Sequence, residues 1–353
     1  MTTGVITYDF FPLIGGIGRL TFMLYGELKD KDMLFFSPAD NSLPGHIRIF
    51  SRFIRPFKHV GVAIWLHCNV HRIIAEHKLS KLNIHSGAGG VLFFRRIDIP
   101  VIITCHHTYW QHYTYITSQF WKRIFYPFEK LTYLRADKII SNSEDTTRVL
   151  VERYDIPEEK ITLIPCAVDY HKFHCTNQEK RFNSIFYIGR IDTRKGVDFL
   201  IRSMPLVVQQ IPDALLLVGG NGSHLDKMKS LVNRLNLKRN VTFLGFVPDD
   251  KLNALYNKAQ CVVVPSIFEG FGITVIEAIA AGTRVVGTDV DGIRSTITSG
   301  DYGSLVPYGD CRALADAIVA ELKNPRMAQE LAPKYRLDHI RSRYLEVLEE
   351  TTH

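Results

Sequence analysis

The stretch Cys261-Val-Val-Val-Pro265-Ser-Ile-Phe-Glu269-Gly-Phe-Gly-Ile273-Thr-Val-Ile-Glu277-Ala decides the fold class. Its first four residues are continuously apolar, which is typical of a strand buried on both faces of a parallel sheet. A glycine-containing loop follows, and beyond the loop the chain has the pattern of a helix. A strand that leads through such a loop into a helix is half of a β-α-β unit, so the stretch predicts an α/β domain.

The same alternation of apolar runs and helical patterns extends through the chain and predicts two parallel sheets. In the first half we expect strands at 5–8, 33–36, 101–104, 138–141 and 161–164, and in the second half at 184–188, 214–218, 241–243, 261–264 and 284–286. The polar, aperiodic stretch 169–181 separates the two sets. We therefore expect two Rossmann-like domains, 1–168 and 169–323, followed by a helical segment at 324–353.

Composition excludes several classes of protein. The 353 residues are 46% hydrophobic and 22% charged, which suits two globular domains and not a disordered chain. Six cysteines lie far apart without a CxxC pair, so we expect reduced thiols and neither a zinc site nor a disulfide scaffold. The chain has no run of eighteen apolar residues and its start lacks the features of a signal peptide, so we expect a cytoplasmic protein.

The net charge of +7 is unevenly distributed. Residues 46–135 contain thirteen Lys and Arg but only three acidic residues. This excess predicts an anionic partner: a membrane surface, a charged glycan or, less well, a nucleic acid. The region has no recognisable module with exposed aromatic platforms, so we expect no nucleic-acid partner.

The segment 46–58 could provide a membrane surface. At helical spacing Ile47, Phe50, Ile54 and Phe57 form an apolar stripe and Arg48, Arg52 and Arg55 a basic one, as in an interfacial helix. The alternative is a crossover helix that packs on its own sheet with its arginines in water. The first interpretation predicts peripheral association with the inner face of a membrane.

Three loops at the carboxyl ends of predicted strands carry residues suited to a phosphorylated ligand. One contains Gly15 and Gly16 before a helix, although a glycine turn that merely closes a strand-helix unit would look the same. The second is Gly189-Arg190-Ile-Asp-Thr-Arg-Lys195-Gly196, whose cations suit a diphosphate unless the loop is simply solvated. The third contains Glu269 and leads to Glu277; carboxylates accept paired hydrogen bonds from sugar hydroxyls.

Together these motifs resemble glycosyltransferase family four, the retaining glycosyltransferases of the GT-B fold. The resemblance rests on the Gly15-Gly16 loop, Gly189-Arg190 with Lys195-Gly196, Val218-Gly219-Gly220-Asn-Gly222, Phe243-Leu-Gly-Phe-Val247 and Glu269-Gly-Phe-Gly with Glu277. It extends from residue 5 to about 322 in the order that the family has. One departure is Asp291-Gly-Ile-Arg-Ser295, where the family usually has Gly-Gly-x-Pro-Glu.

The resemblance implies roles for individual residues. Glu269, His106, Arg190 and Lys195 would act in catalysis: Glu269 on the donor sugar, the two cations on the diphosphate, and His106 beside the reacting sugar, with His107 as the alternative. Glu277 would hold the ribose and Gly16 the diphosphate from the opposite domain. The implied donor-binding residues are Gly15, Gly16, Gly189, Gly219, Phe246, Val247, Phe271, Gly272, Ile273, Thr274 and Glu277. The segment from Met327 to Val347 would be a helix that crosses back to the first domain.

The function expected from the resemblance is retaining transfer of a hexosyl group. The donor would be a UDP- or GDP-sugar bound between the domains, and the acceptor a glycan or lipid-linked molecule of polysaccharide or envelope-glycan synthesis. We expect no cofactor and no metal, because turn and cap roles account for Asp30-Lys-Asp32 and Asp289-Val-Asp291. The alternatives are a nucleotide-sugar epimerase of the same fold and a non-catalytic binding module.

Overall fold

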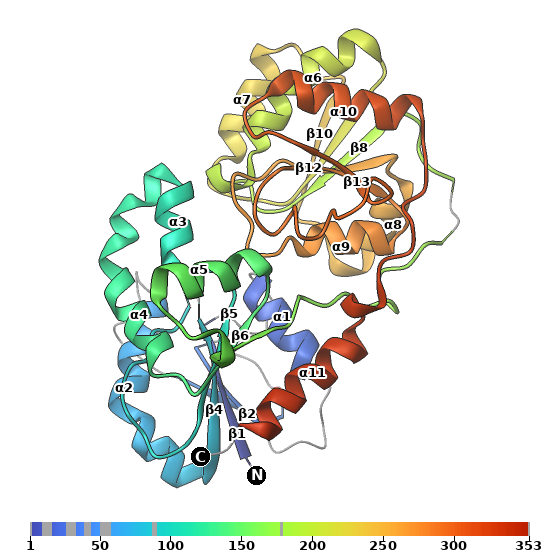
Figure 1. Ribbon diagram of the computed structural model, residues 1–353. Helices are drawn as coiled ribbons and strands as arrows, with labels where there is room; N and C mark the ends of the chain where they lie inside the picture. The colour runs from blue at the N-terminus through green and yellow to red at the C-terminus, as the bar shows by residue number, and fades with distance from the viewer. Residues whose placement is uncertain are drawn as a thin grey trace. The chain divides into compact units, whose positions relative to one another are not determined.

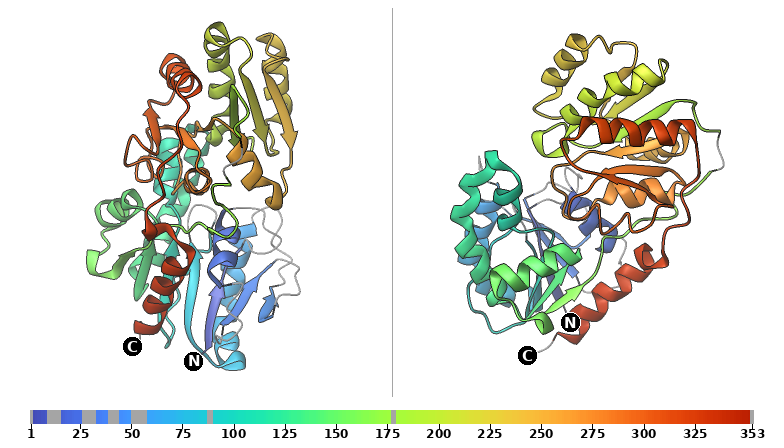
Figure 2. Two further views of the ribbon diagram at one scale, coloured as in Figure 1. Left: turned by 90° about the vertical axis from the view of Figure 1, so that its right-hand side faces the viewer. Right: turned by 45° about the horizontal axis from the view of Figure 1, so that its top comes forward.

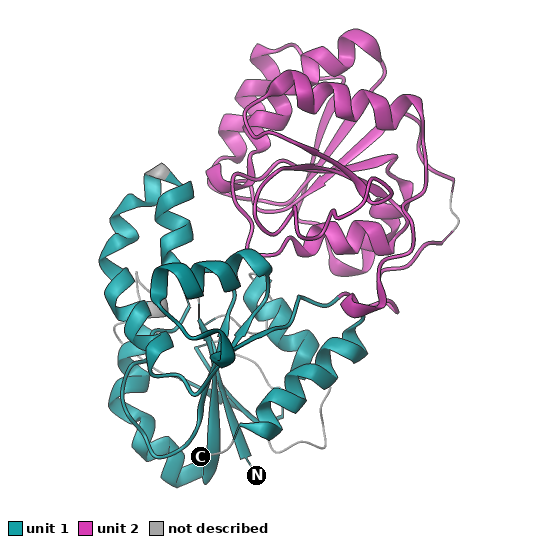
Figure 3. Cartoon of the chain, in the orientation of Figure 1, with its two compact units in different colours: residues 1–167, 336–353 teal, residues 168–335 magenta. Residues whose placement is uncertain are grey.

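The computed structural model describes residues 2–8, 16–25, 33–38, 44–49, 58–86, 90–176 and 179–351. The chain divides into two compact units, which Figure 3 shows in different colours. Unit 1 consists of Met1–Ala167 with Arg336–His353, and unit 2 of Val168–Tyr335. The second unit therefore ends at Tyr335, whereas the sequence had suggested an end at residue 323.

The described strands of unit 1 form a seven-stranded parallel sheet in the order β3-β2-β1-β4-β5-β6-β7 (Figure 1). The strands are β1 (Thr2–Ile6), β2 (Met33–Ser37), β3 (His46–Arg48), β4 (Leu79–Ser86), β5 (Val101–Cys105), β6 (Lys138–Ser141) and β7 (Ile161–Leu163). The helices are α1 (Gly16–Tyr25), α2 (Lys58–His77), α3 (Tyr109–Tyr115), α4 (Tyr126–Leu134), α5 (Glu144–Tyr154) and α11 (Leu337–Glu350), with 3-10 helices η1 (Thr117–Phe125) and η2 (Glu158–Lys160).

The described strands of unit 2 form a six-stranded parallel sheet in the order β10-β9-β8-β11-β12-β13. The strands are β8 (Ser184–Ile188), β9 (Leu215–Gly219), β10 (Val241–Gly245), β11 (Cys261–Val264), β12 (Arg284–Thr288) and β13 (Gly303–Val306). The helices are α6 (Val197–Gln210), α7 (Leu225–Arg234), α8 (Asp249–Lys258), α9 (Ile273–Ala280) and α10 (Cys311–Lys323), with 3-10 helices η3 (Thr193–Lys195) and η4 (Pro333–Tyr335). Helices α6 and α10 pack together on one face of the sheet and α8 and α9 on the other (Figures 1 and 2).

Every strand that the sequence predicted overlaps an observed strand, whereas β3, β4 and β13 were not predicted. The central strand β4 was missed because polar residues interrupt its apolar pattern. Two of them have partners from other parts of the fold: the Lys81 ammonium donates to the Leu348 carbonyl and, at 3.2 Å, to that of Thr351, and the Asn83 amide donates to Thr104 Oγ1 at 3.0 Å. Burial of such groups is tolerated because they are hydrogen-bonded.

Helix α11 packs on α1 within unit 1. The rings of Tyr25 and Tyr344 meet edge to face with centroids 6.4 Å apart, and the Arg341 guanidinium donates to the carbonyls of Met23 and Leu24 at 2.7 and 3.1 Å. Those carbonyls belong to the last turn of α1, where a cation is favourable. The helix expected from Met327 begins only at Leu337, and residues 327–335 belong to unit 2, so that expectation was wrong over its first ten residues.

The prediction of an interfacial helix at 46–58 is wrong for its first three residues. His46–Arg48 is the edge strand β3, in which His46 pairs with Phe35 and Ile47 with Phe36. Alternate residues of a strand point to opposite faces, so Ile47 and Arg48 do not begin two helical stripes. Residues 50–57 lie outside the described residues. Among the described helices, no segment is long and apolar enough to span a bilayer.

Local sequence explains where several helices begin. Thr108 and Gln111 form a reciprocal capping box at the start of α3, with bonds of 3.1 Å from the Gln111 amide to Thr108 Oγ1 and 2.8 Å from the Thr108 amide to Gln111 Oε1. Asp310 caps α10 by accepting from the amides of Arg312 and Ala313 at 3.1 and 2.9 Å. These caps satisfy amides that have no partner within their helix.

A buried ion pair joins β12 to α10. The guanidinium of Arg284 donates through Nε and Nη2 to the two carboxylate oxygens of Glu321 at 2.8 and 2.9 Å, and through Nη1 to the Gly300 carbonyl at 2.6 Å. Both side chains are almost fully buried. A bidentate pair of this kind leaves a costly charge behind when either partner is removed.

We predict that Glu321→Ala lowers the free energy of unfolding by about 3 to 5 kcal/mol, because Arg284 then remains charged and buried. The double variant Arg284→Met/Glu321→Leu should recover most of that loss, since it removes both charges and fills the space with apolar atoms. Urea titration followed by circular dichroism measures both. Equal destabilisation in the single and double variants would show that packing and not charge pairing dominates here.

Candidate active site

The order of the strands in unit 2 brings two predicted loops together. From β8 the chain continues to β9 and β10 on one side, and then crosses to β11 on the other side of β8. The crevice at such a reversal, beyond the carboxyl ends of the two neighbouring strands, is where α/β sheets bind ligands. The loop after β8 contains Arg190, Arg194 and Lys195, and the loop after β11 contains Ser266 and Glu269.

Glu269 is buried at this position and is surrounded by hydrogen-bond donors. Its Oε1 accepts from the Lys195 ammonium at 2.5 Å and from the Ser266 hydroxyl at 2.8 Å, and its Oε2 accepts from the Arg194 guanidinium at 3.2 Å. Burial by itself would raise the pKa of Glu269, but the charges of Lys195 and Arg194 outweigh it and lower the pKa to about 2. Glu269 is therefore an ionised, acceptor-only group at neutral pH.

Backbone contacts hold these two loops against each other. Gly196 has a φ of +63°, and a Cβ at this position would lie 1.9 Å from the carbonyl oxygen of Pro265, so only glycine allows this approach. The amide of Ile267 donates to the Arg194 carbonyl at 2.8 Å. The approach of the loops after β8 and β11 thus depends on the glycine that follows Lys195.

The helix after the Glu269 loop contains the second predicted carboxylate. Gly272 adopts a φ of +87° at the N-terminal cap of α9, whose first residues are the half-buried Ile273 and Thr274. Glu277 is buried one turn into α9, and its Oε2 accepts from the hydroxyl of Tyr256 in α8 at 2.8 Å. Phe271 is also buried, with its ring 6.0 Å from that of Tyr335. The first amides of α9 have no partner within the helix, which favours an anion there.

Other predicted donor-binding residues lie on neighbouring loops of the same sheet. The amide of Gly189, directly after β8, donates to the carbonyl of Gly219 at the end of β9 at 3.2 Å. After β10, Phe246 is exposed and Val247 is buried. The side chain of Arg190 is 64% exposed and its Nε lies 3.7 Å from Asp192, so the cation that joins Lys195 at Glu269 is Arg194 and not Arg190.

In unit 1 the order of the parallel strands reverses between β1 and β4. A pair of histidines lies beside this point. His85 and Ser86 are the last two residues of β4. Nδ1 of His85 lies 3.0 Å from Nε2 of His106, which follows β5, and 3.2 Å from Oγ1 of Thr21 in α1. Burial lowers the pKa of His106 to about 4, and burial together with the neighbouring His106 lowers the pKa of His85 well below its usual range, so both imidazoles are neutral at pH 7. Nε2 of His85 has no hydrogen-bond partner within the described ranges.

The remaining predicted residues of unit 1 have separate surroundings. Gly16 is the exposed first residue of α1, and a Cβ there would meet no atom within 4 Å. Gly15 lies outside the described residues. The ring of His107 stacks on that of His112 with centroids 4.7 Å apart, so His106 and His107 contact different elements.

Three participants were not singled out from the sequence, and a fourth, Arg194, was considered only as one of the cations of its loop and was not given a role. Arg194 and Ser266 contact Glu269, Tyr256 contacts Glu277, and His85 contacts His106. Arg194 adjoins Lys195 and Ser266 precedes Glu269 by three residues, so proximity in the sequence could have suggested both. Tyr256 and His85 lie 21 residues from their partners, and only the fold brings them together.

The loop that departs from the family pattern packs against the Glu269 loop. Gly292 has a φ of +80°, and the space beside it is filled by the Glu269 carbonyl oxygen, 2.6 Å from where a Cβ would lie. Arg294 contacts Asp289 at 2.6 Å and Asp291 at 3.8 Å, so a cation already neutralises the second DxD sequence. Asp30 and Asp32 lie outside the described residues.

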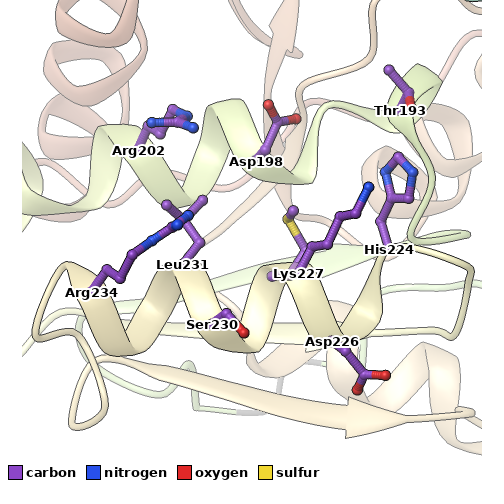
Figure 4. A pocket seen from close by; sticks show the side chains of 10 residues that line it. Thr193, Asp198, Arg202, His224, Asp226, Lys227, Ser230, Leu231 and Arg234 are labelled. Atoms are coloured by element: carbon purple, nitrogen blue, oxygen red, sulfur yellow. The ribbon is translucent and has the colours of Figure 1, made fainter.

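A separate groove of about 550 Å³ runs between α6 and α7 (Figure 4). Its side chains carry both signs of charge, Asp198 and Asp226 against Arg202, Lys227 and Arg234. It contains none of the residues predicted for the site. The groove therefore does not extend the cluster at Glu269.

Comparisons with known proteins identify the fold and the family. Residues 14–172 match the family described as Glycosyltransferase Family 4, and residues 172–337 match Glycosyl transferases group 1. Sucrose-phosphate synthase from Thermosynechococcus elongatus superposes with a TM-score of 0.84 at 22% identity over 99% of this chain and 98% of that one. HepE of Anabaena in complex with UDP-glucose superposes with a TM-score of 0.72 at 16% identity over 99% of this chain and all of that one. These likenesses confirm the predicted α/β fold of the GT-B type.

Curated relatives match over shorter stretches. The D-inositol 3-phosphate glycosyltransferase of Nocardia farcinica is 30% identical over 210 residues, which are 55% of this chain and 47% of that protein. The phosphatidyl-myo-inositol mannosyltransferase of Mycobacterium leprae is 39% identical over 143 residues, 40% of this chain and 37% of that protein. The chain spans about half the length of the curated relatives it matches.

The lowered pKa of Glu269 predicts a particular dependence of stability on pH. A carboxyl whose pKa is lowered by folding stabilises the fold above its unfolded pKa, and this contribution is lost as the pH falls toward the folded value. The stability advantage of the wild type over Glu269→Gln should therefore shrink by about 2 kcal/mol between pH 6 and pH 3. Urea titrations at several pH values measure this, with the exposed Glu330→Gln as control. A difference that does not vary with pH would contradict the ion cluster.

Proposed function

This chain belongs to the group 1 glycosyltransferases, glycosyltransferase family 4, and we propose that it transfers a hexosyl group from a nucleotide-diphosphate sugar with retention of anomeric configuration. The observation that carries the proposal is the cluster of Glu269, Lys195 and Arg194 beside the start of α9. It combines an ionised carboxylate, which can hold sugar hydroxyls, with two cations and a helix start, which suit a diphosphate.

The chemistry proposed for this cluster is electrostatic. When the bond between the sugar and the diphosphate breaks, negative charge develops on the diphosphate oxygens. Lys195, the exposed Arg190 and the first amides of α9 would stabilise that charge, and groups already held in place do so at little reorganisation cost. Arg194 makes its contacts to Glu269 and to the Phe268 carbonyl, 3.1 Å away, so we assign it to positioning the carboxylate.

Glu269 keeps capacity for a ligand. An ionised carboxylate offers about four lone-pair directions. The contacts to Lys195, Ser266 and Arg194 use three of them, two at Oε1 and one at Oε2. A donor-sugar hydroxyl would bind at Oε2. The departing diphosphate would then take the proton of the acceptor hydroxyl, which attacks on the face that the diphosphate leaves.

The donor and acceptor classes are part of the proposal. The complex of HepE with UDP-glucose supports a UDP-sugar donor for this fold, with a GDP-sugar as the second possibility. The names of the two curated relatives, which refer to inositol phosphate and to phosphatidyl-inositol, support a small polar or lipid-linked acceptor. We propose a glycan or lipid-linked acceptor on the cytoplasmic side. In unit 1, neutral His106 would donate or accept a hydrogen bond without adding charge.

We predict different consequences for the two carboxylates. Glu277→Ala should weaken binding of the nucleoside diphosphate, whereas Glu269→Ala should chiefly lower kcat. Loss of a hydrogen bond to a charged acceptor costs about 1.5 to 3 kcal/mol, which corresponds to roughly ten- to a hundred-fold in either constant. Calorimetry with UDP and GDP and a transfer assay with their sugars measure the two effects, with the exposed Asp250→Ala as control.

The same assay distinguishes the proposal from the other functions considered. Isomerisation of the donor without transfer to an added acceptor would indicate an epimerase. Nucleotide binding with neither reaction, across a panel of glycan and lipid-linked acceptors, would indicate a binding module. Unchanged affinity and unchanged turnover in both carboxylate variants would overturn the placement of the donor.

We also predict that transfer continues in EDTA. The cations around Glu269 would supply the positive charge that a divalent ion supplies to other transferases. The rate with EDTA should remain within about twofold of the rate with added Mg²⁺ or Mn²⁺. Complete loss that either metal restores would contradict the proposal and direct attention to Asp30 and Asp32.

A further inference from the structure

The outer surface of η1 and α4 in unit 1 exposes large apolar side chains. Ile124 and Phe120 are 63% and 59% exposed, and Trp121, Phe128, Leu131 and Leu134 are each exposed by two fifths or more. Soluble surfaces seldom gather so many large apolar groups on one segment, and contiguous patches of this kind mark binding sites. In Figure 1, α3 and α4 form one margin of unit 1.

This exposure follows from the way α4 packs. Glu129, Thr132 and Tyr133 are its buried residues, and they form one face at helical spacing. Phe128, Leu131 and Leu134 lie on the opposite face, so the helix is apolar on its solvent side as well. A helix that only covered its own sheet would need a polar outer face. The outer face of α4 therefore fits a surface that is covered by something else.

Basic residues surround these apolar side chains. Lys122, Arg123, Lys130 and Arg135 come from the same segment, and Arg95 and Arg96 from the stretch beside it. Arg135 donates to the carbonyl of Phe94, and the ring of Phe94 lies 5.8 Å from that of Phe128, so Arg95 and Arg96 adjoin the apolar surface. We refer to these six basic residues with Phe120, Trp121, Ile124, Phe128, Leu131 and Leu134 as the η1–α4 patch.

Negative charge is nearly absent from the η1–α4 patch. Glu129 is the only acidic residue between positions 109 and 136. It is fully buried, and burial raises its pKa to about 8, so it is largely uncharged at neutral pH. Asp155, from the end of α5, pairs with Lys130. The six basic residues of the patch thus outnumber its acidic neighbours Glu129 and Asp155, and the patch as a whole is positive.

We propose that the η1–α4 patch docks this protein on an anionic lipid bilayer. Apolar side chains on one face of a helix enter the boundary between headgroups and acyl chains, while flanking Lys and Arg contact lipid phosphates. Each basic residue near an anionic leaflet strengthens binding about fivefold at low salt. Lys and Arg also have long apolar stems, which let their charged ends stay at headgroup level as the apolar side chains insert.

Charge complementarity favours the bilayer over a second copy of this chain. A symmetric dimer through the η1–α4 patch would place the same basic residues of both copies opposite each other, and like charges across an interface are unfavourable. An anionic bilayer offers the opposite sign together with an apolar interior. The proposal rests on the surface of unit 1 alone and does not depend on the donor chemistry of unit 2.

Sedimentation with lipid vesicles tests the proposal on the full chain. Vesicles of phosphatidylcholine alone are compared with vesicles that also contain 30% phosphatidylglycerol, at low and at high salt. We expect binding to the anionic vesicles that is stronger at low salt, because screening weakens it. Negligible binding to both compositions, or equal binding to both without dependence on salt, would overturn the proposal.

Matched variants locate the binding surface. Phe120→Ser/Ile124→Ser should lower the affinity for anionic vesicles at least tenfold, and Lys122→Ser/Arg123→Ser should lower it about 25-fold and reduce its salt dependence. Phe182→Ser, an exposed phenylalanine of unit 2, and Lys227→Ser/Lys229→Ser on α7 are the controls and should bind as the wild type does. Equal losses in patch and control variants, or no loss in the patch variants, would contradict the location.

Two further measurements keep the result specific. Circular dichroism and thermal stabilisation by UDP show whether each variant remains folded, independently of vesicle binding. Light scattering across a range of protein concentrations shows whether the patch joins two copies instead. A dimer that Phe120→Ser/Ile124→Ser abolishes, together with absent vesicle binding, would replace the bilayer by a second copy of the chain.

Discussion

The carboxylate of Glu269 needs compensation for its burial, and much of the arrangement of unit 2 serves that need. An isolated buried charge would cost far more than a domain can tolerate, so Lys195, Arg194 and Ser266 must all reach it. These partners lie on the loops after β8 and β11. The two strands are neighbours because the order of the strands in the sheet reverses between them. The close approach of Gly196 to Pro265 then fixes the distance between the loops.

Unit 1 satisfies a comparable requirement with a segment from the far end of the chain. Its central strand β4 carries a lysine that needs acceptors in a buried position, and the last carbonyls of α11 provide them. Arg341 of α11 in turn donates to the last carbonyls of α1. Positive side chains at the carboxyl ends of helices are favourable for the helix dipole as well. The return of residues 336–353 to unit 1 is thus explained by hydrogen bonding as much as by apolar packing.

The basic residues of 46–135 have different surroundings in the structure. Lys81 is buried and hydrogen-bonded within the fold, and so contributes to stability and not to a surface field. Arg95, Arg96, Arg123 and Arg135 are exposed beside the apolar side chains of η1 and α4. Charge in the sequence indicated an anionic partner, and among the described residues the surface that we propose for it is the η1–α4 patch.

Local pattern in the sequence determined the α/β class, ten of the strands, and the loop and helix that carry Glu269 and Glu277, because each depends on residues close to one another in the chain. Tertiary structure alone decided that Arg194 and not Arg190 reaches Glu269 and that His85 meets His106. It also decided that the polar sequence of β4 is a central strand. In each case the deciding contact joins residues on different elements, and a polar side chain can be buried only where such a distant partner exists. Periodicity within one segment carries no information about that partner.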